Sequence, residues 1–410
     1  MADGSLTRPA PAPSGSRGDA WRRLPVAARI AAIYLAARLV TTGFLLLAAR
    51  ASTAESRFGE SPSLGDFVLG WDAQWYWSVA VFGYPAVPPT SDSGDIAENA
   101  WAFMPVYAHV ANAVGLGSWG AGALAVSLAS GYLACLVLYR LLRLRQDESA
   151  SLWAVAFFAS APVAAMFQVG YAESLFLLLL FCALLCVALR RWWWLYGVIP
   201  VLAFTRPGVL ALALMLGLYG IWRWRRRAVD PLPGAEIAHI VALGALATAV
   251  GFAWQLIAGA VTGNPQAYLE TELAWRRAWS DAFGVFVPFE GWVEAAGIWF
   301  RLWGMPAWMG YAALVLLVAA VVGMFFAPPV RRLGIEVRLW AASYLLYLFA
   351  VFFPQSSTFR LLLPLSPLWG AVAAPRSRAL RVSVLALCLL GQAVWIAAMY
   401  GSGNRFWQIP

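Results

Sequence analysis

The chain has 410 residues, of which 62% are hydrophobic and only 12% are charged. So few charges cannot cover the surface of a water-soluble protein, but they suit a chain whose solvent is mostly lipid. Its 29 basic residues give a net charge of +9, and all of them are arginines that gather in short clusters between apolar runs. This pattern is typical of membrane proteins. We therefore expect a lipid bilayer as partner and no nucleic acid.

Segment 1–20 is rich in proline, serine, glycine and alanine, which predicts a disordered cytoplasmic tail. The apolar run from Leu24 to Ala49 is long enough to be an uncleaved first span. Further spans are predicted near 119–139, 151–169, 173–189, 192–204, 207–222, 236–258, 306–326, 339–354, 359–373 and 381–400. The expected fold is all-α, with about eleven transmembrane helices. They form one domain over 21–400, and a C-terminal tail follows over 401–410.

The arginine clusters predict the orientation of these spans, because basic residues concentrate on the cytoplasmic side. The clusters lie at 140–145, 190–191, 223–227, 331–338 and 376–381. A cytoplasmic N-terminus in the plasma membrane places all of them inside, and it places loops 50–118 and 259–305 outside. Segment 101–116 must then lie at the outer interface or partly buried, since a span there would reverse every later cluster.

The first outer loop contains a run of aromatic residues between Phe67 and Pro85. Taken as one helix, its apolar face comprises Val68, Trp71, Trp75, Val79 and Phe82, which predicts an interfacial helix flat on the membrane. Asp72 and Tyr76 stand one turn apart on the adjoining face. Partial desolvation at headgroup depth raises the pKa of such an acid and makes it a better general base. The structural alternative is an acid favoured by the positive end of a helix.

Several motifs resemble those of the PIG-V mannosyltransferases in the GT-C superfamily. Trp71-Asp72 is followed by Gly83-Tyr84 and then by Ala102-Phe103-Met104-Pro105, where Met104 stands in place of the usual aromatic residue. Tyr171 to Phe176 resembles a Tyr-Ser-Glu-Ser-Leu-Phe segment, with Ala172 for the first serine. Arg38 matches an arginine of the first span, and Arg206 and Arg360 resemble weaker positions. The similarity covers about 30–210 and indicates a bacterial, actinobacterial-like member.

The resemblance implies transfer of a mannosyl or other hexosyl unit from a polyprenyl-phosphate donor to an extracytoplasmic hydroxyl, with inversion. Asp72 inherits the role of general base. Residues expected to bind substrate are Arg38, Asp66, Trp71, Tyr76, Tyr84, Phe103, Glu173, Arg206 and Arg360. The acceptor stays open between a glycolipid, a cell-wall polymer and a protein.

Other interpretations remain for individual charges. Asp66 and Glu173 can each cap a helix, and Arg206 and Arg360, at outer span ends, suit either a phosphate or lipid headgroups. A charge inside a span needs a partner, so Arg38 is expected to pair with Glu173 or Asp72 or to face the donor phosphate. In the second loop, Glu270, Glu272, Arg276, Arg277 and Asp281 are interpreted first as surface pairs and second as acceptor contacts.

The chemistry needs no nucleotide, and one acid without a histidine cluster makes a poor metal site, so no cofactor is expected and a divalent metal is left open. The alternative function is a transporter or flippase of lipid-linked sugars. It would require polar groups along a path through several spans, whereas the polar content gathers at one face. A cavity roofed by 60–105 would favour the enzyme, and a continuous path would favour transport.

Overall fold

A computed structural model describes residues 21, 23–277 and 286–402 of the chain. The predicted tail 1–20, Arg22, Asp281 and residues 403–410 of the predicted tail 401–410 lie outside the described residues. The described part is helical, and its only β-type pairing is an isolated bridge between Thr90 and Ile96. The all-α prediction is therefore confirmed.

Within the residues that the structure describes, five helices are long and apolar enough to cross a membrane. They are α2 (Val26–Ala51), α6 (Trp119–Arg143), α11 (Gly234–Thr262), α14 (Ala307–Met324) and α19 (Arg378–Ile396), which continues as a π-helical turn, Ala397–Gly401. These helices mark the chain as a membrane protein. The count of about eleven spans stays a prediction, because the other expected spans coincide with shorter or more charged helices.

These other helices lie in the same segments that hydrophobicity predicted. They are α7 (Glu148–Ala159), α8 (Glu173–Ala188), α9 (Trp192–Ala203), α10 (Val209–Arg226) and α16 (Ile335–Val351). The expected span 359–373 is broken into α17 (Thr358–Leu361), a 3-10 helix (Leu363–Leu368) and α18 (Trp369–Ala373). Pro364 and Pro367 lie in its middle and cannot donate the backbone hydrogen bonds of a continuous α-helix. The expected span 151–169 likewise ends at Ala159, before Pro162, and continues as a 3-10 helix over Ala164–Gln168.

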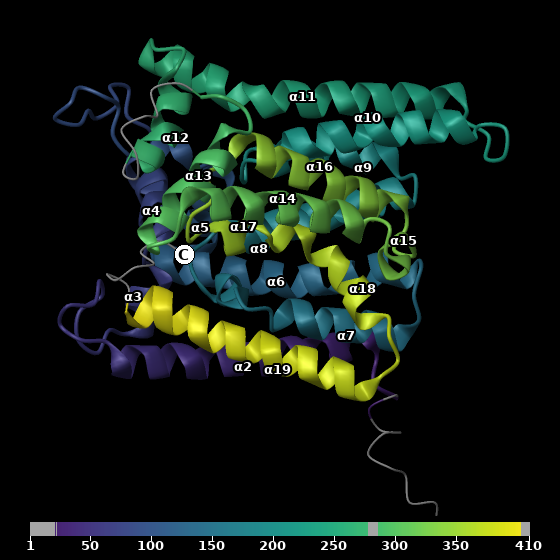
Figure 1. Cartoon of the computed structure of the whole chain (residues 1–410), viewed down its shortest axis with the longest axis horizontal. Helices are drawn as coiled ribbons and strands as arrows, with labels where there is room; N and C mark the ends of the chain where they lie inside the picture. Colours follow the sequence, from purple (N-terminus) through teal and green to yellow (C-terminus); the bar gives the residue numbers. More distant parts are fainter. Residues whose placement is uncertain (1–20, 22, 278–285, 403–410) are drawn as a thin grey trace, which may run out of the picture.

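The connecting loops carry the remaining elements. These are α3 (Leu64–Val68), α4 (Asp72–Phe82), a 3-10 turn (Ala100–Ala102), α5 (Pro105–Gly115), α12 (Ala267–Arg277), α13 (Glu290–Leu302) and α15 (Pro328–Arg331). Figure 1 shows α3, α4 and α12 together at one end of the bundle, while α15 and the α10–α11 turn lie at the opposite end. The two long loops thus share an end, as the alternation of spans predicted. The side of the membrane that this end faces stays a prediction.

Helix α5 covers most of segment 101–116, which the predicted topology does not allow to cross the membrane. It has 11 residues, and Tyr107, Ala108 and Ala111 are buried. It lies so close to α6 that a Cβ atom on Gly122 would stand 1.9 Å from the carbonyl oxygen of Ala111. The prediction that segment 101–116 is partly buried is therefore confirmed, since α5 packs as a short brace beside α6.

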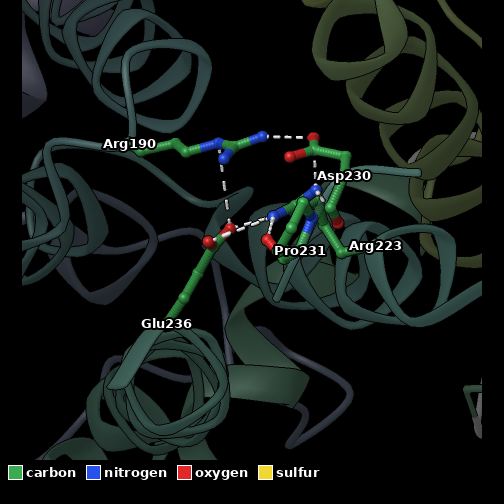
Figure 2. Close-up of polar contacts among 5 residues, drawn as sticks. All are labelled: Arg190, Arg223, Asp230, Pro231 and Glu236. Atoms are coloured by element: carbon green, nitrogen blue, oxygen red, sulfur yellow. Dashed lines mark hydrogen bonds and ion pairs between the residues drawn. The ribbon is translucent and has the colours of Figure 1, made fainter. Parts of the chain in front are cut away.

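The α10–α11 turn is held by a charged cluster, which we call the turn cluster: Arg190, Arg223, Asp230 and Glu236 (Figure 2). The fully buried Arg223 side chain forms ion pairs with both acids, with N–O distances of 2.5 Å to Asp230 and 3.0 Å to Glu236. It also donates to the carbonyl oxygen of Pro231 at 2.9 Å. Arg190 reaches in from the α8–α9 connection and contacts Asp230 at 2.5 Å. The turn cluster therefore ties α10 and α11 to the α8–α9 connection at the end opposite α4.

Candidate functional site

A break in the first outer loop positions Asp72. The expected single helix is wrong, because Trp71 adopts a left-handed backbone with φ of 55° and separates α3 from α4. The break depends on Gly70, since a Cβ atom there would stand 2.5 Å from the Phe58 ring. Asp72 thereby becomes the first residue of α4, and its backbone N–H donates to the Tyr171 hydroxyl at 3.1 Å. The buried residues of α4 are Ala73, Tyr76 and Val79, and of these only Val79 belongs to the apolar face predicted for a single helix.

Four charged residues from distant segments meet beside Asp72, and we call them the cavity cluster: Asp72, Glu173, Arg206 and Arg360. An Arg360 Nη1 donates to Asp72 Oδ2 at 2.5 Å, although 288 positions separate them in the sequence. The same nitrogen lies 3.2 Å from Glu173 Oε1, and an Arg206 Nη2 lies 3.4 Å from that oxygen. Two carboxylates and two guanidiniums therefore alternate in a short chain of contacts.

The cavity cluster is incompletely satisfied. The Glu173 side chain is only 2% exposed, yet its Oε1 accepts no hydrogen bond from any residue that the structure describes, despite the two guanidinium contacts. The Nε of Arg360 is also buried without an acceptor in that part of the chain. Burial raises the pKa of the Asp72 carboxyl above its ordinary value, and the adjacent Arg360 guanidinium opposes the rise. A buried, partly satisfied set of charges is typical of a binding site.

A cavity of about 630 Å³ opens onto this cluster. Asp72, Tyr76, Phe103, Arg206 and Arg360 all line it. Its other walls come from the start of α10, the second half of α11, α12 and the last turns of α16. Such a volume is within the usual range for a small-molecule site. The arrangement offers a carboxylate, two guanidiniums and aromatic surface to one bound group.

The second outer loop supplies the wall formed by α12. Tyr268, Glu272 and Arg276 line the cavity at successive intervals of four residues. The interpretation of Glu272 and Arg276 as surface pairs is therefore wrong: both side chains face the cavity instead of the solvent. Burial raises the pKa of Glu272 to about 7, against the opposing effects of a hydrogen bond with Tyr268 and the charge of Arg276. In the sequence, the spacing of four residues between Tyr268, Glu272 and Arg276 indicates that they share one helix face. The pattern was missed because the segment is polar and was interpreted as a surface loop.

Besides Glu173, which contacts the lining residues Arg206 and Arg360 without lining the cavity itself, four predicted substrate-binding residues lie outside the cavity wall. Trp71 is buried beneath the Arg57 guanidinium and donates to the carbonyl oxygen of Met399 at 3.1 Å. The Tyr84 hydroxyl donates to the carbonyl oxygen of Phe103 at 2.8 Å. Asp66 caps α3, with its Oδ2 accepting from the Ser63 N–H at 2.8 Å, so the capping interpretation is confirmed.

Arg38 is the fourth of these residues, and its predicted partners are wrong. Its guanidinium donates to the carbonyl oxygens of Ala159 and Ala164 at 2.5 and 2.6 Å, instead of pairing with Glu173 or Asp72. The reason is local for Ala159, because α7 ends there and leaves this carbonyl without an intrahelical donor, whereas Ala164 begins the 3-10 helix that follows. Arg38 therefore joins α2 to the break between α7 and α8.

Tyr171 belongs to the motif that ends at Phe176, but it was not predicted to be part of the site. Its hydroxyl accepts from the Asp72 N–H, and its ring centroid lies 5.1 Å from the Arg360 guanidinium carbon. It thus supports both partners of the ion pair. Tyr171 precedes Glu173 by two residues. The same short segment therefore supplies the Glu173 carboxylate and the ring that packs against Arg360.

No protein-family model matches the chain, and no curated protein matches its sequence. Three solved structures of the oligosaccharyltransferase from Archaeoglobus fulgidus are similar. AglB in complex with an inhibitory peptide and a dolichol-phosphate has 13% identity and a TM-score of 0.42, covering 89% of this chain and 56% of that one. The complex with Zn and sulfate has 12% identity and a TM-score of 0.42, and the match covers 88% of this chain and 53% of that one. The form tethered to an acceptor peptide has 12% identity and a TM-score of 0.41, and the match covers 90% of this chain and 55% of that one. The chain spans just over half the length of each.

Proposed function

We propose that the chain is a membrane glycosyltransferase that moves a hexosyl unit from a polyprenyl-phosphate donor to an acceptor hydroxyl. The observation that carries the proposal is the meeting of Asp72, Arg206 and Arg360 on the wall of one cavity at the end of a helical membrane bundle. A general base and a pair of phosphate-binding cations are the groups that this reaction requires.

Arg206 and Arg360 would hold the donor phosphate. Guanidinium groups bind phosphate oxygens through charge-assisted hydrogen bonds in a fixed planar geometry. The Arg360 side chain is only 11% exposed and that of Arg206 9%, so an anion bound there is shielded from water. Low local dielectric strengthens the interaction with the negative charge that develops on the leaving phosphate.

Asp72 would act as the base. Its carboxylate takes the proton of the acceptor hydroxyl while that oxygen bonds to the anomeric carbon of the donor sugar. The bond from this carbon to the phosphate oxygen breaks, and its electron pair leaves on the phosphate beside the guanidiniums. Attack opposite the leaving group inverts the anomeric centre. Arg360 pairs with Asp72, and a phosphate that draws the guanidinium away leaves a carboxylate with stronger affinity for a proton.

The position of the cavity favours an enzyme over the alternative transporter. Its roof includes Asp72, Tyr76 and Phe103 from the first loop, and its walls come from the adjoining ends of α10, α11 and α16. These residues lie at the end of the bundle that carries α4 and α12 (Figure 1). A transporter needs polar groups along a path to the opposite end.

Mannose as the sugar, inversion, and membership of the PIG-V mannosyltransferases rest on the resemblance carried by Trp71-Asp72, Gly83-Tyr84 and the Tyr171–Phe176 segment. The test uses the full chain in lipid nanodiscs with polyprenyl-phosphate-[³H]mannose and bacterial membrane lipid as acceptor. We expect labelled lipid to form, with polyprenyl phosphate as the co-product in equal amount. Release of intact donor across a vesicle membrane without chemical change would support the transporter instead.

A further inference from the structure

Helix α12 is fixed in place over the cavity by contacts at three points. The Asn99 side chain donates to the Thr271 hydroxyl at 2.8 Å, and the Arg277 guanidinium donates to the carbonyl oxygen of Ile96. On the other side, the Arg276 guanidinium donates to the carbonyl oxygen of Val351 at the end of α16. The face that carries Glu272 is thus held between the first loop and α16.

The chemistry of this face differs from that of the cavity cluster. Tyr268, Glu272 and Trp275 line the cavity, and the Trp275 ring stands edge-on to Trp75 and Phe103 at 6.2 and 6.0 Å. Aromatic rings offer flat apolar surface, while a carboxyl accepts hydrogen bonds from hydroxyl groups. A pyranose ring presents both complements, with an apolar C–H face and a rim of hydroxyls. Arg276 also lines this wall, but its guanidinium donates to the carbonyl oxygen of Val351, and Glu272 would repel a phosphate.

We propose that Glu272 binds sugar hydroxyls and that α12 forms a sugar subsite of the cavity, distinct from the phosphate subsite at Arg206 and Arg360. The proposal rests on the glycosyltransferase function and names a recognition residue for it. The electrostatic environment of Glu272 agrees with a sugar subsite that is separate from the phosphate subsite. The pKa of Glu272 is raised to about 7 mainly by burial and further by the charge of Asp72, so a neutral, hydroxyl-bearing group suits this wall better than a second anion.

The test is equilibrium binding to the full chain in nanodiscs, with three probes: farnesyl phosphate, farnesyl-phosphate-mannose and octyl mannoside. Glu272→Gln keeps the side-chain volume and removes the charged acceptor. We expect it to weaken the sugar-bearing probes about tenfold and to leave farnesyl phosphate unchanged. A loss limited to farnesyl-phosphate-mannose assigns the subsite to the donor sugar, whereas a loss for octyl mannoside assigns it to a sugar-bearing acceptor.

The matched control is Glu270→Gln, on the same helix. Glu270 accepts from the Asn264 amide at 3.0 Å and does not line the cavity, so all three affinities should remain at the wild-type value. If Glu272→Gln fails to fold, Tyr268→Phe removes the hydroxyl bonded to that carboxyl and should weaken the same probes about threefold.

Two results would overturn the assignment. Unchanged binding of all probes, or equal weakening of farnesyl phosphate, removes Glu272 from sugar recognition while leaving the proposed function intact. A wild-type protein that binds none of the three probes overturns the proposed function and the subsite with it.

Discussion

The two charged clusters use the same residue types at opposite ends of the bundle, yet they are bonded differently. In the turn cluster, Arg223 is fully buried, meets both oxygens of Glu236 at 3.0 and 3.1 Å and also reaches backbone carbonyls (Figure 2). In the cavity cluster, one oxygen of Glu173 is shared between two guanidiniums and accepts no hydrogen bond from the described residues. None of the turn cluster lines the 630 Å³ cavity. Complete bonding indicates a structural role, and incomplete bonding beside a cavity indicates a binding role.

The strongest test of this comparison replaces one acid in each cluster. Asp72→Asn removes the proposed base, so transfer should fall by about 100- to 10,000-fold. Asp230→Asn, in the turn cluster, should leave the turnover of folded protein unchanged. Both are measured as transfer of labelled mannose from the polyprenyl-phosphate donor, normalised to folded protein. Undiminished transfer by a folded Asp72→Asn protein would exclude Asp72 as the base.

The arginines should show opposite effects on activity and stability. Arg360→Gln removes one partner of the donor phosphate and should lower turnover about 100-fold. Arg223→Gln leaves the buried Glu236 carboxylate without its bidentate partner and should destabilise the fold by about 3–5 kcal/mol. Turnover and denaturant midpoints on both variants check the prediction. Equal loss of stability in the two proteins would mean that both clusters are structural.

Sequence patterns were sufficient to locate helices and candidate site residues where a residue differs from its neighbours in polarity or charge. Apolar runs located the helices, and charges at the ends of such runs singled out Arg206 and Arg360. The Trp-Asp motif singled out Asp72, and all three residues line one cavity. These successes share a cause, because a charge in an apolar context costs free energy and so stands out as functional or paired.

Features that depend on tertiary packing were missed. The break before Asp72 exists because Phe58 packs against Gly70, a contact that no local pattern reveals. The partners of Arg38 are the backbone carbonyls of Ala159, the last residue of α7, and of Ala164 in the 3-10 helix that follows, so a search for acidic side chains could not identify them. Helix α12 was interpreted as surface because its polar residues are typical of a loop, and only its contacts with the first loop turn Glu272 toward the cavity.

Glu272 gives a smaller, pH-dependent effect on stability. Its pKa is about 7 in the folded protein against an ordinary value of 4.5, so folding favours the protonated form. The stabilisation is present at low pH and is lost as pH rises through 7. Glu272→Gln removes this dependence, so its melting temperature should match wild type near pH 4.5 and exceed it by a few degrees above pH 7. Thermal unfolding from pH 4.5 to 8 measures it, and a gain independent of pH would contradict the raised pKa.

Asp66 should show the smallest effect. It lies in the same loop as Asp72, but its carboxylate is bonded within a helix cap, so it tests whether bonding separates structural acids from binding ones. Its Oδ2 accepts from the Ser63 N–H and hydroxyl, both at 2.8 Å, in a closed capping box. Asp66→Ala should therefore cost about 1 kcal/mol of stability and leave turnover unchanged. Chemical denaturation and the transfer assay on one preparation measure both quantities. A large loss of turnover with little loss of stability would show that a satisfied acid in this loop also contacts substrate, and bonding alone would then no longer distinguish binding residues from structural ones.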